Sequence, residues 1–372
     1  MTDLKKNQKR IVFFLPNFNI GGASESILKL TKFLIKYKFS ILIISIGKNF
    51  YKKDFKKINC EIIEIKSKKT SFSIFKLRKI MINEISKNFD KIIFISNINY
   101  ANIISIISLI NLHKIRIILT ERSSISELRY GDTLFKKIKN KLIYFLARCL
   151  YKYSDLIITN SKFEKKYIQD NFQLKRVICI HPPSIKNIIK TNNSSNKKIP
   201  QIIYVGRLSR EKGVFVILEA LLEIRKKYSF VFNFYGDGPD KKYVKKFIQK
   251  NNLKDMVFLN GFIKNKNFIF KNADLFVNAS HWEGLPNALV QSINYNVFPI
   301  CSDAPGGNIE VIKNGKFGMS FKTNNKEDLQ KKIIKFFDKR FKLKNRSRII
   351  HLKNFTEKKS NEEYLKTLNN LK

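Results

Sequence analysis

The stretch Ala273–Gly318 reads ADLFVNASHWEGLPNALVQSINYNVFPICSDAPGGNIEVIKNGKFG. Its first apolar run, Leu275–Asn278, is typical of a buried strand, and Pro286 is placed to begin a helix. A second apolar run, Val297–Cys301, follows that helix. Two buried strands joined through a helix predict a parallel pair inside a sheet.

The same alternation of short apolar runs and longer helical patterns extends in both directions from this stretch. The runs are Ile11–Leu15, Ile41–Ile46, Glu61–Ile65, Ile92–Ile95, Ile115–Leu119, Leu156–Thr159, Val177–Ile180, Ile202–Val205, Phe230–Tyr235, Val257–Leu259, Leu275–Asn278, Val297–Cys301 and Phe317–Phe321. Helical spacing of apolar residues occurs over Ser24–Tyr37, Val214–Tyr228 and Lys241–Asn251. Continuous apolar strands between amphipathic helices indicate parallel sheets that are covered on both faces. We therefore predict an α/β protein of two doubly wound, Rossmann-like domains facing a cleft.

A polar interval separates the two halves of the pattern. Lys186–Pro200, KNIIKTNNSSNKKIP, is rich in Asn, Ser and Lys and has no periodicity, which is typical of a linker. The expected domains are therefore 1–185, which precedes the linker at 186–200, and 201–350. Residues 351–372 form a last helical segment that can belong to either domain or cross back to the first.

Composition excludes an intrinsically disordered chain, because 44% of the 372 residues are hydrophobic and 27% are charged. Lys plus Arg number 73 against 29 acidic residues, so the formal net charge is +44. Such an excess favours an anionic partner: nucleic acid, a phospholipid surface or a phosphorylated substrate. The abundance of Ile, Lys, Asn and Phe has a second explanation, the codon bias of an AT-rich genome, and both explanations stay open.

Cysteine spacing and hydropathy limit the class of protein further. Cys60, Cys149, Cys179 and Cys301 form no C-x-x-C pair, so neither a zinc cluster nor a disulfide framework is expected. No apolar run approaches the roughly 18 residues that a membrane-spanning helix needs. We expect a cytoplasmic protein, either soluble or peripheral on the inner face of the membrane.

Several polar loops follow the predicted strands at their carboxyl ends, where open α/β sheets bind ligands. Arg207 and Lys212, in GRLSREKG, suit a diphosphate, because an arginine can bind two oxygens at once. Glu283 precedes the helix that begins at Pro286, and the positive end of that helix suits a pyrophosphate. A carboxylate in this position can accept hydrogen bonds from hydroxyl groups.

Structural explanations exist for each of these motifs by itself. The pair Gly21 and Gly22 fits an anion-binding loop or a tight strand-to-helix turn equally well. A basic pair is common by chance in so lysine-rich a chain. The loop before Pro286 can equally be an ordinary helix cap.

Taken together and in order, the motifs resemble the retaining glycosyltransferases of glycosyltransferase family 4, which have the two-domain GT-B fold. The resemblance covers nearly the whole chain. It rests on GGAS, TERSS (Thr120–Ser124), SDLIITNS (Ser154–Ser161), GRLSREKG, GDGP and EGLPNALVQS.

The resemblance implies a nucleotide-sugar donor that is held mainly by the second domain. It implies that Arg207 and Lys212 bind the diphosphate and that Glu283 holds the sugar hydroxyls, all three as catalytic residues. The remaining implied donor contacts are Gly22 from the first domain, Phe262 and Ile263 at the base, and Gly284, Leu285, Pro286 and Asn287 at the phosphate and sugar. No cofactor and no metal are implied.

Two positions depart from the family pattern. Gln291 stands where the family has a second glutamate, a residue that hydrogen-bonds the donor ribose. An amide accepts such bonds without the strength that charge adds, so we predict weaker donor binding but not inactivity. Arg122 stands where relatives often have histidine, which suggests an acidic group on the acceptor side.

The implied activity is transfer of a hexose or N-acetylhexosamine, with UDP as the expected nucleotide from family frequency alone. The implied acceptor is a glycan, as a lipid-linked, lipopolysaccharide or capsule or exopolysaccharide intermediate. A basic nucleic-acid-binding protein is the alternative from another class, motivated by charge alone. Because no nucleic-acid module is recognisable, we expect no nucleic-acid partner. A catalytically lost relative is the third hypothesis, with Gln291 as its only support.

Two basic stretches can be interpreted either as membrane-binding surfaces or as ordinary sheet-covering segments. Leu134–Tyr151 predicts an amphipathic helix with lysines on one side and apolar residues on the other, and Lys66–Lys79 is a second basic stretch that contains phenylalanine. The residues of the first are Lys136, Lys137, Lys139 and Lys141, then Ile138, Leu142, Phe145, Leu146 and Cys149. Either stretch can lie on an anionic membrane surface or can cover a sheet with its lysines in water.

Overall fold

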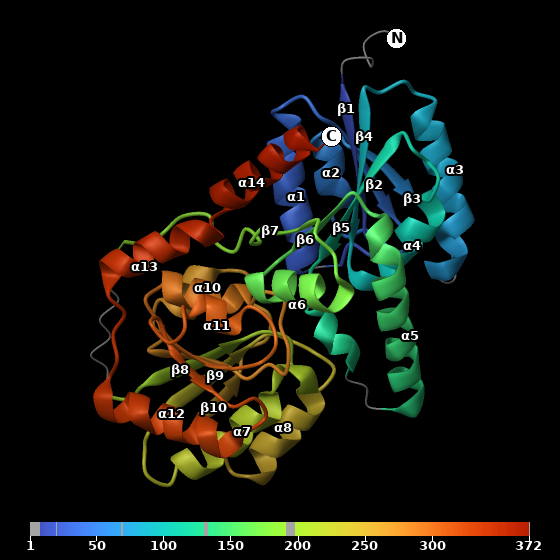
Figure 1. Cartoon of the computed structure of the whole chain (residues 1–372). Coiled ribbons are helices and arrows are strands. Elements are labelled where there is room, and N and C mark those ends of the chain that lie inside the picture. The colour runs from blue at the N-terminus through green and yellow to red at the C-terminus, as the bar shows by residue number, and fades with distance from the viewer. Residues whose placement is uncertain (1–7, 20, 68–69, 130–132, 191–197, 372) are drawn as a thin grey trace. The chain divides into compact units, whose positions relative to one another are not determined.

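A computed structural model describes residues 8–19, 21–67, 70–129, 133–190 and 198–371 (Figure 1). The chain divides into two compact units, which are described separately below. Unit 1 comprises Met1–Pro183 and Glu357–Lys372, and unit 2 comprises Ser184–Thr356. The expected linker over 186–200 therefore falls inside unit 2, and its residues 191–197 lie outside the described part of the chain.

Unit 1 contains a seven-stranded parallel sheet in the order β3-β2-β1-β4-β5-β6-β7. Its strands are β1 Lys9–Phe14, β2 Ser40–Ser45, β3 Glu61–Glu64, β4 Lys91–Asn97, β5 Ile115–Glu121, β6 Leu156–Thr159 and β7 Val177–Cys179. Its α-helices are α1 Gly22–Ile35, α2 Lys52–Lys57, α3 Ile74–Ile85, α4 Asn99–Leu109, α5 Leu134–Leu150, α6 Lys162–Phe172 and α14 Glu357–Asn370.

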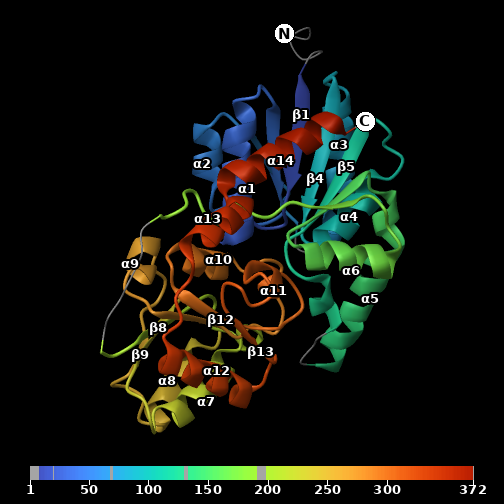
Figure 2. The ribbon, with the colours of Figure 1, turned by 60° about the vertical axis from the view of Figure 1, so that its left-hand side comes forward.

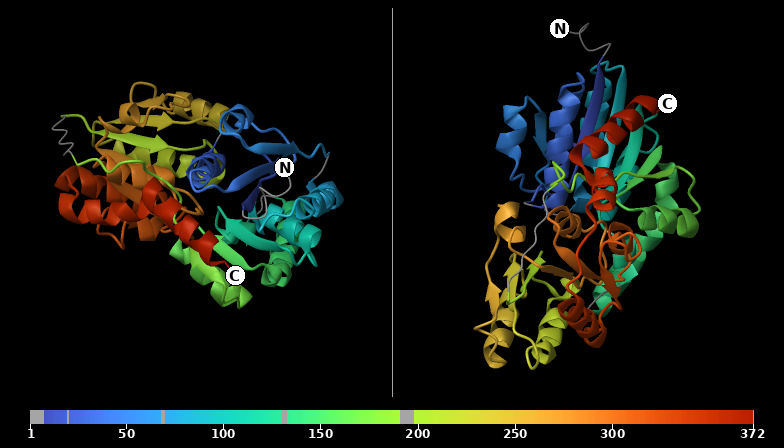
Figure 3. Two further views of the ribbon diagram at one scale, coloured as in Figure 1. Left: turned by 90° about the horizontal axis from the view of Figure 1, so that it is seen from above. Right: turned by 90° about the vertical axis from the view of Figure 1, so that its left-hand side faces the viewer.

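Both faces of this sheet are buried, as its continuous apolar strands predict. Along β1, Val12 and Phe14 enter a core beneath α3, α4, α5 and α6, whereas Ile11 and Phe13 enter a second core on the opposite face. The last helix, α14, packs on that opposite face through Tyr364 and Leu368, beside α1 (Figure 2). Figure 3 shows in two further views that this red helix ends against unit 1.

Unit 2 contains a six-stranded parallel sheet in the order β10-β9-β8-β11-β12-β13. Its strands are β8 Gln201–Val205, β9 Val231–Tyr235, β10 Val257–Leu259, β11 Leu275–Asn278, β12 Phe298–Ser302 and β13 Met319–Phe321. Its α-helices are α7 Val214–Ile224, α8 Lys241–Lys250, α9 Lys266–Phe270, α10 Asn287–Asn294, α11 Asn308–Val311, α12 Lys326–Lys339 and α13 Asn345–Leu352. All the apolar runs of the sequence form strands, so the prediction of two doubly wound α/β sheets is confirmed.

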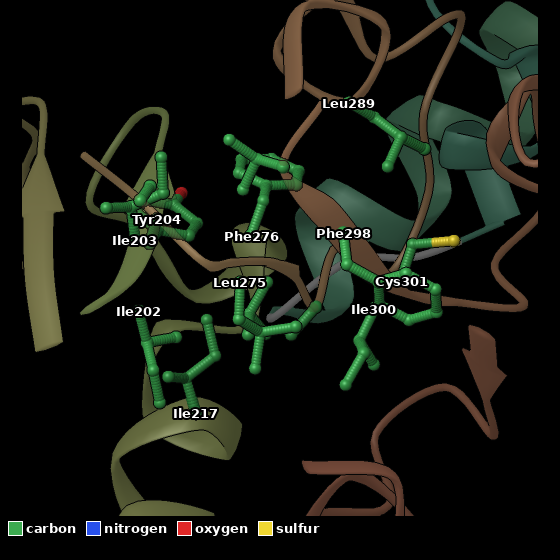
Figure 4. Close-up of a cluster of buried hydrophobic side chains, with 14 of the residues drawn as sticks. Ile202, Ile203, Tyr204, Ile217, Leu275, Phe276, Leu289, Phe298, Ile300 and Cys301 are labelled. Carbon is green, nitrogen blue, oxygen red and sulfur yellow. The ribbon is translucent and has the colours of Figure 1, made fainter. Parts of the chain in front are cut away.

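The quoted stretch lies at the centre of unit 2, because β11 pairs with β8 on one side and with β12 on the other. Figure 4 shows Leu275 and Phe276 of β11 between side chains of β8 and β12. Ile217 of α7 and Leu289 of α10 are part of the same buried cluster. Strand β11, which precedes the loop that contains Glu283, is thus buried on both faces and paired along both edges.

A buried arginine fastens α13 to the end of α10. Arg348 Nη1 donates hydrogen bonds to the carbonyl oxygens of Ile293 at 3.0 Å and Asn294 at 2.7 Å. Its Nη2 donates to Ile189 O at 2.9 Å and Asn345 Oδ1 at 3.0 Å. These carbonyls end α10, and helix carbonyls in the last turn have no partner inside their own helix. The guanidinium therefore caps α10 from a second helix.

We predict that Arg348→Met lowers the free energy of unfolding of unit 2 by about 2–4 kcal/mol, because buried carbonyls lose their donors. Trp282 is the single tryptophan of the chain and lies in unit 2, so urea unfolding followed by its fluorescence reports this unit. Arg346→Met at an exposed position of the same helix is the control. Equal unfolding midpoints for the two variants would contradict this role of Arg348.

Candidate functional site

The loop between β11 and α10 places a carboxylate at the carboxyl edge of the unit 2 sheet. Glu283 Oε1 lies 2.7 Å from Lys212 Nζ, and the Ser280 hydroxyl donates to the same oxygen at 2.7 Å. The side chain of Glu283 is 15% exposed and that of Lys212 is 25% exposed. The ion pair is therefore mostly shielded yet open at one side. Glu283 Oε2 takes part in neither bond and can accept from a ligand.

Lys212 belongs to the loop after β8, and backbone contacts hold this loop against the β11–α10 loop. His281 N donates to Glu211 O at 2.8 Å. Gly213 has φ +66°, and a Cβ there would lie 2.0 Å from Ala279 O. Only glycine fits this approach without strain. The two loops thus meet through main chain and side chain together.

A third loop, which follows β12, fixes the backbone of Glu283. Glu283 N donates to Pro305 O, and Gly307 N donates to Gly284 O, each at 3.0 Å. Gly306 has φ +126°, and a Cβ there would lie 1.8 Å from Glu283 O. Glycine is therefore needed at position 306 of the Pro-Gly-Gly sequence, because a side chain there would push away the loop that contains Glu283.

Buried polar residues connect Glu283 to the interior. The Asn308 amide donates to Ser302 O at 2.9 Å, and Ser302 Oγ donates to Ser280 O at 2.6 Å. Ser280 then donates to the Glu283 carboxylate. Sequence reasoning missed Ser280, Ser302 and Asn308; the only signal is small polar residues in and after otherwise apolar strands. These residues orient the carboxylate.

Arg207 leaves the end of β8 and is 68% exposed. Its main-chain carbonyl accepts a hydrogen bond from the buried Tyr204 hydroxyl at 2.7 Å, which fixes the backbone there. Its guanidinium lies 3.9 Å from Glu211 Oε1, a distant contact in water. The guanidinium is thus available to an anion at the same sheet edge as Lys212.

Two predicted residues of α10 turn toward the start of unit 2. Asn287 Oδ1 accepts from Ser184 Oγ at 2.7 Å, and Gln291 Nε2 donates to Ser184 O at 3.1 Å. A glutamate at position 291 could not donate that second bond. The Gln291 amide can donate to Ser184 O through Nε2 and still accept from a hydroxyl through Oε1. The sequence alone does not show this, because the contact with Ser184 appears only in the folded chain.

The other predicted donor residues of unit 2 lie around the same edge. Leu285 is buried in the core, and Gly284 provides the carbonyl that binds Gly307. Pro286 is the residue that precedes α10. Beyond the end of β10, Phe262 is 67% exposed and Ile263 packs partly on the core. An exposed aromatic ring at this position can stack on a planar group.

His281 is beside the carboxylate and is held by its backbone. Burial lowers the pKa of its imidazole, and the Glu211 carboxylate opposes that shift in part. The imidazole is therefore neutral near pH 7. The positive charge of the loops after β8 and β11 comes from Lys212 and Arg207 instead.

Two predicted residues belong to unit 1. Gly22 begins α1, and residue 20, two positions before it, lies outside the described part of the chain. The Arg122 Nε donates to Asn97 Oδ1 at 3.1 Å, while Asn160 donates to Arg122 O at 3.1 Å. Arg122 is thus half-buried and oriented. Its role toward an acceptor, and that of Gly22 toward a donor, stay predictions.

Behind Arg122, a buried carboxyl group ends β5. Glu121 Oε1 accepts from the Tyr151 hydroxyl, and also from the Asn102 amide at 2.9 Å. Burial raises the pKa of Glu121 to about 8, and its Oε2 has no hydrogen-bond partner. The nearby Glu164 carboxyl binds Ser124 Oγ and Ile125 N, and burial raises its pKa to about 7. Sequence reasoning did not find either group.

Within the described residues, no group of three or more His, Cys, Asp or Glu side chains is placed to hold a metal ion. In the same part of the chain, no helix combines the length and the apolar character that a membrane crossing requires.

Comparison with known proteins finds several glycosyltransferases among the relatives. Residues 185–353 match the family described as Glycosyl transferases group 1. An uncharacterized glycosyltransferase of Methanocaldococcus jannaschii is 29% identical over 308 residues, which cover 77% of this chain and 73% of that protein. An α-1,4-N-acetyl-D-galactosaminyltransferase of Campylobacter jejuni is 25% identical over 340 residues, 87% of this chain and 88% of that one. Its name gives GalNAc-α-(1→4)-GalNAc-α-(1→3)-diNAcBac-PP-undecaprenol as the acceptor.

Among solved structures, HepE of Anabaena in complex with UDP and glucose aligns with a TM-score of 0.75 at 15% identity. The alignment covers 97% of this chain and 99% of that chain. At this identity the likeness concerns the fold, and it confirms the predicted GT-B fold class.

We predict that Glu121→Gln weakens the pH dependence of stability of unit 1. The folded carboxyl keeps its proton up to a pKa of about 8, against an ordinary value of 4.5. Between these values a rise in pH deprotonates only the unfolded chain, so stability falls by about 1.4 kcal/mol per pH unit. The neutral glutamine removes this fall.

The measurement is urea unfolding by circular dichroism at about pH 6 and about pH 8, with the exposed Glu25→Gln as the control. Relative to wild type, Glu121→Gln should gain stability at the higher pH by a few kcal/mol. An equal difference at both pH values would show that Glu121 is ionised in the folded chain.

Proposed function

We propose that this chain, whose residues 185–353 match the family of glycosyl transferases group 1, is a glycosyltransferase that moves a hexose or N-acetylhexosamine from a UDP-linked donor. The acceptor that we propose is a glycan on a lipid carrier or another cell-envelope polysaccharide intermediate. Transfer retains the anomeric configuration, as the resemblance implies. The observation that carries the proposal is the Lys212–Glu283 pair at the carboxyl edge of the sheet, with Arg207 beside it.

In this reaction, the bond between the anomeric carbon and a diphosphate oxygen breaks, and a bond to an acceptor hydroxyl oxygen forms. Negative charge therefore develops on the departing nucleotide. The exposed Arg207 guanidinium and the Lys212 ammonium are the cations that can stabilise this charge. In the proposal they do so without a resident metal or other cofactor, and transfer should continue in the presence of a chelator.

Glu283 has the complementary task. Its Oε1 is occupied by Lys212 and Ser280, while Oε2 can accept from hydroxyl groups of the donor sugar. A carboxylate accepts such bonds more strongly than a neutral group does. The backbone of Gly284, Leu285 and Asn287, with Pro286 starting the helix, then supports phosphate and sugar. Phe262 and Ile263 would border the base.

The relatives support the chemical class of both substrates. The Campylobacter jejuni relative is named for a lipid-linked acceptor, and the Anabaena structure contains UDP and glucose. We extend both properties to this chain as part of the proposal, including the reaction at a membrane surface.

The net charge of +44 favours nucleic-acid binding as the alternative. Incubation with radiolabelled UDP-, GDP- and ADP-sugars and a membrane extract separates the two functions, because only a transferase labels the extract or hydrolyses a donor. Inertness toward every donor together with tight nucleic-acid binding would overturn the proposal. Inertness without such binding would indicate a catalytically lost relative.

We predict that Glu283→Ala reduces transfer by about 10²–10³-fold, because the sugar hydroxyls lose a charged acceptor and Lys212 loses its partner. Trp282 fluorescence should report an intact unit 2. The matched control is Glu223→Ala on α7, in which the lost carboxylate is exposed and pairs with Lys226, just beyond the end of that helix. Similar activity in the two variants would exclude the role of Glu283.

We predict that Gln291→Glu lowers the donor KM several-fold, since a charged acceptor strengthens bonds to the ribose hydroxyls. The gain must exceed the loss of the bond from Gln291 Nε2 to Ser184 O, a neutral bond of about 1 kcal/mol. Gln291→Leu should raise KM with a smaller effect on kcat. An unchanged donor KM in Gln291→Glu would remove the ribose role.

A further inference from the structure

A groove of about 590 Å³ lies in unit 2 where α7, α8 and the 3-10 helix η5 (Arg210–Lys212) meet. The helices α7 and α8 pack against each other in this unit (Figure 1). Three aromatic side chains and three cations line the groove: Phe215, Tyr243, Phe247, Arg210, Lys246 and Lys250. We call these six residues the α7–α8 groove. None of them is among the residues that are assigned to the donor, and the volume is that of a small-molecule site, which is roughly 300–1,000 Å³.

Aromatic rings form the apolar part of the α7–α8 groove. Phe215 of α7 and Phe247 of α8 pack partly on the core of unit 2, with their ring centroids 6.5 Å apart and their planes inclined by 62°. Tyr243, in the first turn of α8, is 59% exposed. Tyr243 and Phe247 are four residues apart, so they lie on the same side of the helix. These rings offer a surface on which a planar group can pack.

Positive charges border the rings. Lys246 and Lys250 follow Tyr243 by three and seven residues, so they lie on the same side of α8, while Arg210 comes from η5. All three cations are exposed, and within the described part of the chain their side chains make no ion pair. No described carboxylate lines the groove. The three cations therefore attract an anion without a competing partner.

We propose that the α7–α8 groove binds a small anion that contains a planar ring, an aryl or heterocyclic phosphate, with the ring on the aromatic side chains and the phosphate on the three cations. The absence of a described lining carboxylate selects an anion. The aromatic rings select a planar group over a bare ion. Arg210 can bind two phosphate oxygens at once, whereas the lysines act as point charges.

The groove shares one turn of the chain with the candidate donor site. Lys212 N donates to Ser209 O at 3.0 Å, and Gly213 N donates to Arg210 O at 2.9 Å. Arg210 and Lys212 are therefore the first and last residues of a single turn. A ligand that holds Arg210 also restrains Lys212, and a cation that is already restrained loses less freedom when a diphosphate binds. The groove is thus an effector site, and its effect on the donor rests on the proposed function.

The first experiment measures binding of 4-fluorophenyl phosphate to the full chain by ¹⁹F NMR, with UDP present to occupy the proposed donor site. The dissociation constant should be about 1 mM or lower, as expected for so small a ligand. The phenol lacks the charge and inorganic phosphate lacks the ring, so each should bind at least about tenfold more weakly. Equal affinity for either one, or no binding of the aryl phosphate, would overturn the proposal.

Charge is tested at equal net charge. Arg210, Lys246 and Lys250 are changed to glutamine in one variant, and the exposed Lys245, Lys331 and Lys335 of unit 2 are changed in the other. The groove variant should lose at least about tenfold in affinity for the aryl phosphate, because it loses its charge-assisted hydrogen bonds. Similar losses in the two variants would overturn the proposal, since the attraction would then belong to the overall charge.

The ring contact is tested separately. Tyr243→Ser should raise the dissociation constant of the aryl phosphate about fivefold and leave that of inorganic phosphate unchanged, because only the ring loses a partner. Phe268→Ser is the matched control, since Phe268 is an aromatic residue of unit 2 outside the groove and is 62% exposed. An effect of the same size in Phe268→Ser would contradict the assignment of Tyr243.

Calorimetric titration with UDP tests the effector role. Saturating phenyl phosphate should lower the dissociation constant of UDP about threefold in wild type and leave it unchanged in the groove variant, as binding linkage requires. An unchanged affinity of wild type for UDP would overturn the effector role. A weakened affinity would also overturn it, because phenyl phosphate would then compete for the donor site.

Binding of the aryl phosphate is measured without any transfer assay, so the two proposals can fail separately. A chain that binds the aryl phosphate in the groove but transfers no sugar would reject the reaction and leave the groove supported. A chain that transfers sugar but does not bind the aryl phosphate would overturn the groove alone.

Discussion

The ion pair between Lys212 Nζ and Glu283 Oε1 is the interaction on which the candidate site depends. It joins the loops after β8 and β11, which are neighbouring strands of a parallel sheet. In a parallel sheet the carboxyl ends of both strands lie at one edge, so the loops that contain Lys212 and Glu283 lie side by side. Gly213 and Gly306 then allow the backbones to approach closely enough for a bond of 2.7 Å. Lys212 thus provides a cation for a phosphate, and Glu283, in contact with it, provides a carboxylate for hydroxyl groups.

Much of the fold was predictable because strands that are buried on both faces are apolar along their whole length. Runs such as Ile41–Ile46 and Leu275–Asn278 are apolar throughout, and both became strands that are covered on two faces. The attachment of α14 was not predictable in this way. Its place beside α1 depends on Tyr364 and Leu368 meeting a distant core, and the periodicity of a single helix cannot identify its partner.

The candidate site was predictable at its charged members and hidden at its neutral ones. Arg207, Lys212 and Glu283 follow strand ends and stand out by charge, whereas Ser280 looks like any loop residue until its hydroxyl is seen on the carboxylate. The orientation of α5 was not predictable for a different reason. Amphipathic spacing shows that a helix has two sides, but not which side the core takes, and here Ile143 and Ala147 take it.

Equilibrium binding of UDP to the full chain tests the central claim most directly. If Arg207 and Lys212 hold the donor diphosphate, calorimetric titration should show binding that weakens at least about tenfold in Arg207→Met and in Lys212→Met. Lys245→Met, at an exposed position of α8, should bind UDP as the unaltered chain does. Equal affinity in all four proteins would contradict the account, because the diphosphate would then lie elsewhere.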